Sequence, residues 1–389
     1  MILYATITMR SSPVRPEDQL LVCIARRNLD QLTMQSIKHL LGQPGFDWEY
    51  LSRSAAAHGV LPLLTYHLQS LAVPAIPQTK LESLQKENQQ NTEFSFWLAG
   101  ELVKIVKALQ TRGVPCVPFK GPTLALIAYG DIGLRQFSDL DLFVRRSDFT
   151  RAKAILAELG FKLVRNLDAA REAALLRFDY AMAFVNHRDV LLDVHWRFAP
   201  AHSSFGLESD NTWERLESVD IGGQSVSTFS AEELFLILCC HGFTHDWERL
   251  VWICDLANLI ERPERQLDWD YLRRRAERSG VLRIMMLGVA LAQMLGASVP
   301  AEASDGMRDA TAVEEAERLM GALFTPDRSG LASYSLKRQM RMRERFTDKL
   351  VTLSRQVFTP RDYDCSFAPL PFASLYYLLR PVRMAMKLF

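Results

Sequence analysis

The chain has 389 residues, of which 48% are hydrophobic and 23% charged, and its formal net charge is +1. This length exceeds one ordinary hydrophobic core and predicts two or three domains. The composition excludes collagen-like and low-complexity chains, the balanced charge argues against a surface built for nucleic acid as a whole, and no apolar run approaches the roughly 18 residues of a membrane span.

The cysteines and the first residues indicate the compartment. Six cysteines are spread along the chain without a C-x-x-C pair. The opening stretch MILYATITMRSSP lacks the basic segment and the full apolar segment of a secretory signal. We therefore expect a cytoplasmic protein with reduced thiols.

The first part of the chain is predicted to be helical. Apolar side chains recur at helical spacing through residues 16–110, and Asp47 precedes one of these stretches as a plausible N-cap. A long helix is predicted from about Lys80 to Gln110, ending at Gly113. We assign residues 1–112 to an N-terminal helical region.

The pattern changes at Val114, where short strands begin. The stretches VPCVPF, DLDLFV and FKLV read as strands, and DYAMAFVN with DVLLDVHWRF reads as a hairpin through residues 186–189. GPTLALIAYG reads as a helix with Pro122 in its first turn, and a second helix is predicted after Ser147 as a possible N-cap. Residues 113–229 therefore form an α/β core, and the fold class is α+β, with a small mixed sheet flanked by helical regions.

Helices return in residues 230–389, which we assign to a C-terminal helical domain with a basic tail. Ser230 and Glu233 form a capping box at the start of a helical stretch predicted to continue through Ile260. Residues 46–61 and 267–282 match at nine of sixteen positions, which indicates either a duplicated helical module or convergence on a favourable helix start.

The last segment is basic. From Lys337 to the C-terminus there are 11 Lys and Arg residues against 4 Asp and Glu residues, a local excess of about +7. Such a segment could contact RNA, or lie on an anionic membrane as a peripheral contact. A solvated helix face that packs against the helical domain is the simpler interpretation.

Two aspartates on the predicted strand DLDLFV suggest chemistry. Side chains alternate on a strand, so Asp139 and Asp141 point to one face while Leu140 and Leu142 point into a core. Two carboxylates this close repel each other unless a cation lies between them. Carboxylate oxygens suit Mg²⁺, which proteins hold by one or two carboxylates together with substrate phosphates.

A second strand, DVLLDVHWRF, repeats this arrangement. Asp193, His195 and Arg197 share one face. If this strand pairs beside the Asp139 strand, Asp193 becomes a third carboxylate at the same site. Three carboxylates can hold two metal ions, which stabilise the attacking and leaving oxygens of a phosphoryl displacement.

The turn FKGPT, residues 119–123, offers groups for an anion. Gly121 permits close backbone approach, and the helix that follows presents free N–H groups. Lys120 adds a positive charge and Thr123 a hydroxyl. The turn is suited to a triphosphate, although its spacing is not that of a Walker A loop.

With these residues in view, the chain resembles the DNA polymerase β-like nucleotidyltransferase superfamily, in which a Gly-Ser turn precedes a D-x-D strand and a third acid follows. More narrowly, the stretches KGPTLALIAYG, RQFSDLDLFV, LLDVHW and HGFTHDWERLVWICDLANLI resemble the bacterial uncharacterised nucleotidyltransferase family of the NTP_transf_5 type. The likeness runs from about residue 45 to the C-terminus. In place of Gly-Ser this sequence has Lys-Gly-Pro-Thr, which is similar to the turn of AbiEii-type toxin nucleotidyltransferases.

The resemblance implies a nucleotidyltransferase core and an Mg²⁺-dependent transfer of a nucleoside monophosphate from an NTP to an acceptor, with two ions. It implies that Asp139, Asp141 and Asp193 are the metal ligands and catalytic residues, with Asp193 as the possible base for the acceptor hydroxyl. Lys120, Gly121, Thr123, Arg135 and Ser138 would bind the nucleotide.

Several of these residues have a second, structural interpretation. Arg135 could contact phosphate or pair with an aspartate, and Arg249 could pair with Asp255. His195 is more typical of a structural histidine than of a catalytic one. His241 and His245 have zinc-like spacing, but position 242 is Gly where a zinc protease has Glu. We therefore expect the helical domain that carries them to line the nucleotide or acceptor pocket.

Three functions compete. The first is a nucleotidyltransferase acting on a hydroxyl or phosphate of a small molecule, glycan precursor or peptide. The second is a toxin-like tRNA nucleotidyltransferase, suggested by the Lys-Gly-x-Thr turn and the basic tail. The third is a non-catalytic scaffold or peripheral membrane protein, which has no need to keep three clustered carboxylates.

Overall fold

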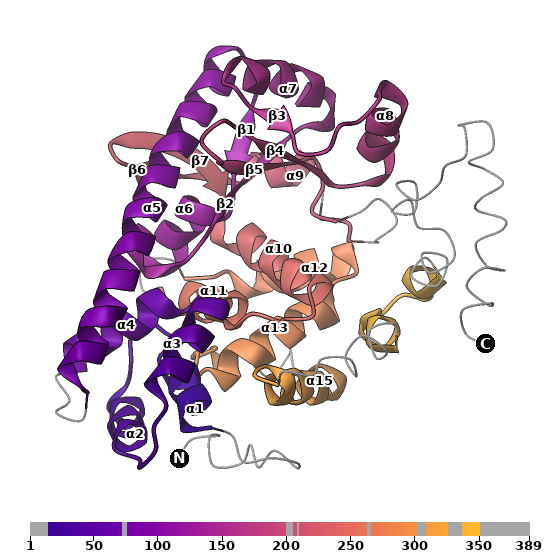
Figure 1. The fold of residues 1–389 in the computed structure, drawn as a ribbon. Helices are drawn as coiled ribbons and strands as arrows, with labels where there is room; N and C mark the ends of the chain where they lie inside the picture. The colour runs from indigo at the N-terminus through magenta and orange to yellow at the C-terminus, as the bar shows by residue number, and fades with distance from the viewer. Residues whose placement is uncertain are drawn as a thin grey trace, which may run out of the picture.

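A computed structural model describes residues 15–71, 76–199, 205–207, 210–262, 266–301, 309–325 and 337–350. A part that contains the sheet and a part made of helices are joined by one long helix, α5, which runs along both (Figure 1). The described helices that precede the first strand are α1 (Pro16–Cys23), α2 (Gln31–Leu41), α3 (Trp48–Ala57), α4 (Leu61–Leu71) and α5 (Gln78–Thr111). Among the described helices, none combines the length and the apolar character needed to cross a membrane.

The sheet has five strands, in the order β1-β2-β5-β4-β3. Strands β2 and β5 are parallel, and the other neighbours are antiparallel. The α+β class, with a mixed sheet between helical regions, is therefore confirmed. The strands are β1 (Cys116–Pro118), β2 (Asp139–Val144), β3 (Lys162–Leu163), β4 (Ala181–Val185) and β5 (Leu191–His195).

The two faces of β2 differ as its alternation predicts. Leu140, Leu142 and Val144 are fully buried and form an apolar layer with the neighbouring side chains of β5. On the other face the two aspartates come first, and Phe143 follows in a group of aromatic rings, stacked on Phe198 at 4.5 Å. The sheet thus places its carboxylates beside a packed aromatic cluster.

Short helical segments follow β1 and β2, and the N-cap predicted for one of them is wrong. Helix α6 (Gly121–Leu124) continues as one π-helical turn (Ala125–Tyr129), and α7 spans Phe149–Glu158. Ser147 does not cap α7: it lies inside a 3₁₀ turn (Arg146–Asp148), and the residue at the N-cap is Asp148.

The sequence patterns did not reveal α8 (Ala169–Phe178), α9 (Asp210–Glu214) or the hairpin of β6 (Leu216–Ile221) and β7 (Gln224–Phe229). Helix α8 buries none of its residues, so it carries little apolar periodicity. The hairpin did leave a signal, because Gly222 and Gly223 both have positive φ in its two-residue turn.

The helices that follow are α10 (Ala231–Thr244), α11 (Leu250–Ile260), α12 (Trp269–Ser279), α13 (Leu282–Met294) and α15 (Ala310–Ala322). The capping box is confirmed, since the Ser230 hydroxyl accepts from the Glu233 N–H. The stretch predicted to be helical through Ile260 forms two helices, because Asp246 and Trp247 take positive φ and turn the chain between α10 and α11. The buried Trp247 ring packs over Gly242, where a Cβ would lie 2.5 Å from that ring.

The matching segments 46–61 and 267–282 adopt the same local structure. Asp47 and Asp268 each cap the helix that follows, α3 or α12, by accepting an N–H three residues on. Gly59 and Gly280 end the two helical segments with φ of +73° and +68°. The predicted N-cap at Asp47 is therefore confirmed.

The similarity extends to residues outside the matched segments. The Tyr50 hydroxyl donates to Asp18 at 2.9 Å, and the Tyr271 hydroxyl donates to Glu233 at 2.5 Å. Each acid follows a glutamate, Glu17 or Glu232, that accepts the backbone N–H of the aspartate cap. We call α1, α3 and α4 the first module and α10, α12 and α13 the second module. Agreement this far from the matched positions favours a repeated module over convergence on a helix start.

Two expectations concern the rest of the chain. The segment from residue 351 to the C-terminus, which carries much of the basic tail, lies outside the described residues, as does Cys365. The five described cysteines are free and buried.

Candidate functional site

The pairing of β2 with β5 brings two of the predicted carboxylates together. In the parallel register Asp141 lies opposite Asp193, and Asp139 lies opposite Leu191. The sequence prediction that the Asp193 strand lies directly beside the Asp139 strand is therefore confirmed. Two residues more than fifty positions apart in the chain become neighbours on one face of the sheet.

Asp141 is held by two nitrogen atoms. Its Oδ1 accepts from Lys120 Nζ at 3.0 Å, and His195 Nε2 lies 3.0 Å from the same oxygen. All three side chains are buried or nearly so. Because the Asp141 oxygen is an acceptor, the imidazole presents Nε2–H to it. Nδ1 is buried and has no hydrogen-bond partner among the described residues.

The three carboxyl groups have different pKa shifts. Burial on its own would raise the pKa of Asp141, but Lys120 and His195 outweigh this and hold it well below its usual value. Burial raises the pKa of Asp139, and the charge of Asp141 raises it further. Burial also raises the pKa of Asp193, where the two other aspartates add to the shift and His195 opposes it. The site thus carries more negative charge than Lys120 alone neutralises.

Among the described residues, Asp141, Asp193 and His195 form a group whose possible ligand atoms all lie within 4.8 Å of one another. Asp139 is outside this group, although it lies close enough for Asp141 to shift its pKa. The structure therefore groups two of the three predicted aspartates with a histidine. The sequence signal for this histidine is its spacing, because Asp193 and His195 alternate onto the same face of β5.

The turn that contains Lys120 is packed against the start of β2. Gly121 has φ of +52°, and a Cβ added there would lie 3.4 Å from the carbonyl oxygen of Asp139. The Thr123 hydroxyl is fully buried and donates to the carbonyl of Lys120 at 2.8 Å. Gly121 thus permits the turn to pack against the carbonyl of Asp139, and Thr123 closes the turn itself; the approach of an anion to Gly121 stays a prediction.

Arg135 and Ser138 lie on the segment that leads into β2. Arg135 forms a buried two-point ion pair with Asp255, from Nε at 2.8 Å and from Nη2 at 2.9 Å. Tyr129 donates its hydroxyl to the same carboxylate at 2.8 Å. Ser138 is exposed. The aspartate partner of Arg135 is therefore identified. The alternative of an ion pair between Arg249 and Asp255 is not formed among the described residues, where Arg135 binds both oxygens of that carboxylate.

The histidines of α10 lie beside the site. His241 and His245 line a small cavity together with Lys120, His195, Tyr180 and Phe198. Their rings lie 4.6 Å apart and contact Trp252. Burial lowers the pKa of His241 strongly, and Lys120 adds to this shift. This cavity lies between the α/β core and α10. That the helical domain lines the nucleotide or acceptor pocket stays a prediction.

Comparison with known proteins agrees with this geometry. The model of the uncharacterised nucleotidyltransferase family matches residues 44–296. No curated protein matches the chain. The solution structure of the antibiotic-resistance factor ANT(2″)-Ia is 16% identical, covers 61% of this chain and 94% of its own, and has a TM-score of 0.28.

Two further solved structures are similar. ANT(2″)-Ia in complex with adenylyl-2″-tobramycin is 19% identical, covers 50% of this chain and 95% of its own, and has a TM-score of 0.28. An antigenic nucleotidyltransferase-like protein from Paracoccidioides brasiliensis is 15% identical, covers 55% and 97%, and has a TM-score of 0.33. Since the family model matches well over half of its length, this chain belongs to the uncharacterised nucleotidyltransferase family and is a transferase.

Proposed function

We propose that the protein transfers a nucleoside monophosphate from an NTP to a hydroxyl or phosphate of an acceptor, with Mg²⁺ held at the carboxylates of β2 and β5. The observation that carries this proposal is the register that sets Asp141 opposite Asp193, with Lys120 Nζ 3.0 Å from Asp141. Membership of the nucleotidyltransferase family supports it.

The side chains fit a divalent cation. Carboxylate oxygens are the ligands that Mg²⁺ prefers, and the raised pKa values of Asp139 and Asp193 indicate negative charge that a cation would neutralise. In the proposal Asp141 and Asp193 hold one ion, and Asp139 contributes to a second. Bound Mg²⁺ supplies charge neutralisation on the transferred phosphoryl group.

The protein's own groups orient the substrates. Lys120 offers an ammonium to a phosphate oxygen, and Gly121 lets a phosphate approach the backbone. Thr123 keeps the turn closed through its bond to the carbonyl of Lys120. Arg135 holds the segment before β2 against α11 through Asp255, while Ser138 lies exposed at the entrance to β2.

The proposal extends to the domains and the acceptor. Residues 113–229 act as the nucleotidyltransferase core, with residues 1–112 and 230–389 as flanking helical units. The acceptor is a small molecule, a glycan precursor or a peptide, and a tRNA acceptor is the alternative that the basic tail suggests. Membership of a transferase family weighs against the non-catalytic alternative.

The test is Asp193→Asn. We expect it to lower Mg²⁺-dependent transfer of label from an α-³²P-NTP by at least about 100-fold, the loss typical when a metal site is impaired. Thermal stability should stay the same or rise, since the substitution removes a carboxylate whose pKa burial raises. The assay takes each NTP with cell extract and, separately, with total RNA, and mass spectrometry identifies the labelled product.

Asp189→Asn is the matched control. Asp189 is exposed in the turn between β4 and β5 and has φ of +59°, a conformation that asparagine also adopts. Transfer by this variant should equal that of the wild type. Equal transfer by Asp193→Asn, or no Mg²⁺-dependent NTP binding by the wild type in calorimetry, would contradict the proposal, and label in RNA would select the tRNA alternative.

A further inference from the structure

A groove of about 340 Å³ lies apart from the cavity beside the carboxylates. It is bounded by α3, by the start of α11 and by the residues that follow α15. Tyr50, Ser54 and His58 line it from α3, Arg249 from the start of α11, and Phe324 from the end of α15. Its volume is at the lower end of the range for small-molecule sites in proteins.

Arg249 is a cation in this groove that has no direct ion pair among the described residues. It is half-buried, and no hydrogen bond or ion pair of its side chain is formed with the residues that the structure describes. Its Nε is buried without a partner. The nearby acid that could have paired with it, Asp255, is fully occupied by Arg135 and Tyr129. A guanidinium partly removed from water without a direct ion pair favours the binding of an anion. Glu248, which is exposed and also lines the groove, offsets part of this charge.

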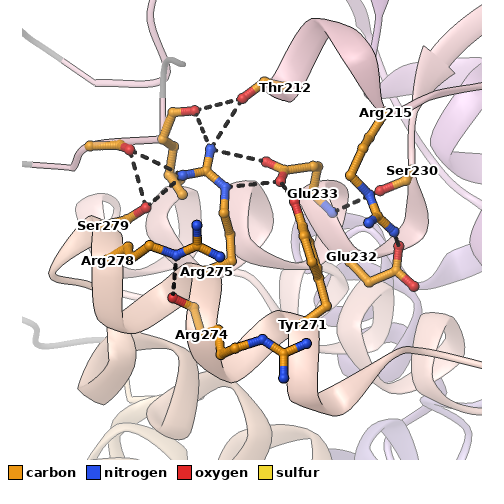
Figure 2. Close-up of polar contacts among 12 residues, drawn as sticks. Thr212, Arg215, Ser230, Glu232, Glu233, Tyr271, Arg274, Arg275, Arg278 and Ser279 are labelled. Carbon is orange, nitrogen blue, oxygen red and sulfur yellow. Dashed lines mark hydrogen bonds and ion pairs between the residues drawn. The ribbon is translucent and has the colours of Figure 1, made fainter. Parts of the chain in front are cut away.

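In the second module, the face of α12 that corresponds to the groove-lining face of α3 is covered. The residues of α12 that correspond to Tyr50, Ser54 and His58 are Tyr271, Arg275 and Ser279. Figure 2 shows Arg275 reaching from α12 to Glu233, Ser279 and Thr212. Arg275 also donates to the carbonyl of Leu207 at 2.7 Å, so a segment of the chain closes this face.

The corresponding face of α3 lacks this closure. Ser54 is too short to take the place of Arg275, and the face lines the groove instead. Among the described residues, the first module therefore leaves open a surface that is filled in the second module. An open surface beside an unpaired arginine is a feature of a binding site rather than of a packing defect.

The lining of the groove is suited to a phosphorylated molecule with a planar ring. Arg249 provides a forked donor for phosphate oxygens, and Ser54 adds a hydroxyl. The rings of His58 and Phe324 pack together at 4.7 Å and present an aromatic surface.

The groove is connected to the catalytic strand. Helix α11 begins after Arg249 and is tied through Asp255 to Arg135, four residues before Asp139. Burial lowers the pKa of Arg249 and Arg135 lowers it further, while Asp139 is foremost among the acids that oppose the shift. Arg249 therefore lies within electrostatic reach of the β2 carboxylates.

We propose that this groove binds a phosphate-bearing substrate of the transfer reaction, with Arg249 as the residue that contacts the phosphoryl group. The inference rests on the proposed function for the nature of the reaction. Its phosphate belongs either to the donor NTP or to a phosphorylated acceptor such as a sugar phosphate. Binding there would explain the guanidinium that has no direct ion pair among the described residues and the open face of α3 together.

The test compares Arg249→Met and Arg249→Lys with the wild-type full-length protein. Calorimetry measures the Kd of each NTP, of inorganic pyrophosphate and of glucose 1-phosphate, all with Mg²⁺. We expect Arg249→Met to weaken at least one of these probes by about 10- to 100-fold, the effect of losing a charge-assisted contact, and Arg249→Lys to weaken it less. Thermal stability should stay the same or rise, because the half-buried guanidinium of Arg249 has a buried Nε without a hydrogen-bond partner among the described residues.

The pattern of losses identifies the source of the phosphate. Weakened NTP binding assigns the groove to the donor, and weakened sugar-phosphate binding with unchanged NTP binding assigns it to the acceptor. Arg53→Met is the control, since Arg53 is exposed on α3 outside the groove. Equal Kd values for every probe in Arg249→Met and the wild type overturn this inference. They leave the proposed function standing, because Asp193→Asn tests that separately.

Discussion

The first and second modules place an acid in the same position, but among the described residues only the acid of the second module has an ion pair with a guanidinium. Glu233 accepts from Tyr271 and from Arg275, and it is fully buried. Asp18 accepts from Tyr50 in the same way, yet Ser54 stands where Arg275 would be. Helices with the same local structure therefore carry a network of hydrogen bonds around Arg275 in the second module and line an open groove in the first.

The two modules therefore differ in how their buried acid is stabilised. Arg275 donates to the carbonyls of Gly206 and Leu207 and so holds that segment against α12 in the second module. In the first module burial raises the pKa of Asp18 to about 6, since Tyr50 and Arg15 lower it less than burial raises it. The open module is the one next to Arg249, which agrees with its proposed role in binding.

Removing the guanidinium of the second module should have the largest effect. Arg275→Ala leaves Glu233 fully buried without a cation, and such broken pairs cost about 3–5 kcal/mol of folding free energy. We expect a drop of this size in urea unfolding. Ser54→Ala, at the corresponding position, should change stability by less than about 0.5 kcal/mol.

The double variant Glu233→Gln with Arg275→Met separates the pair from its packing. Removing both charges takes away the unpaired acid, so much of the stability lost in Arg275→Ala should return. If the double variant is as unstable as Arg275→Ala, the bonds of Arg275 to the carbonyls near Leu207 are the main contribution and not its pair with Glu233.

The second prediction uses the unpaired acid of the first module. The pKa of Asp18 in the folded protein is about 6, above its ordinary value of 3.8, so the folded state binds this proton more tightly than the unfolded state. The stability that the proton provides is fully present below pH 3.8 and is lost as the pH rises through 6. Asp18→Asn should therefore stabilise the protein at pH 8, with a ceiling of about 3 kcal/mol from about 1.4 kcal/mol per pKa unit.

Urea unfolding at pH 4 and pH 8 measures this effect. The gain from Asp18→Asn should be large at pH 8 and close to zero at pH 4, where Asp18 is already protonated. The exposed Asp270→Asn serves as the control. A gain that does not depend on pH would show that the asparagine acts by packing and that the carboxylate is not the cause.

The sequence predicted the parts of the site that depend on strand alternation. Asp139 and Asp141 share a face because side chains alternate on β2, and the hairpin signal at residues 186–189 placed Asp193 on a strand of the same sheet. It did not predict that Lys120 and His195 both bond to Asp141, since that depends on the depth of the turn against β2. Strand alternation gives the face of a side chain but not which neighbour across the sheet it will contact.

Two other features needed the tertiary structure. Arg135 and Asp255 are 120 residues apart, and only the packing of α11 beside the segment before β2 decides that they pair and that Arg249 is left without Asp255. The matched segments 46–61 and 267–282 were visible in the sequence. The acids that complete each module, Asp18 and Glu233, lie about thirty residues earlier and share too little local sequence to be aligned.

The smallest expected effect comes from converting the first module into the second. Ser54→Arg puts a guanidinium where Arg275 stands in the second module, so it should pair with Asp18 and lower the pKa of that acid from about 6 toward its ordinary value. Asp18 is one methylene shorter than Glu233, so the contact is less favourable, and a gain of about 1 kcal/mol at pH 8 is expected. The pH dependence of urea unfolding between pH 4 and pH 8 should flatten, while Ala56→Arg, which faces away from the groove, should keep the wild-type profile. An unchanged profile in Ser54→Arg would mean that an arginine at position 54 does not reach Asp18. The similarity between the two modules would then be limited to the hydrogen bond from the tyrosine to the acid.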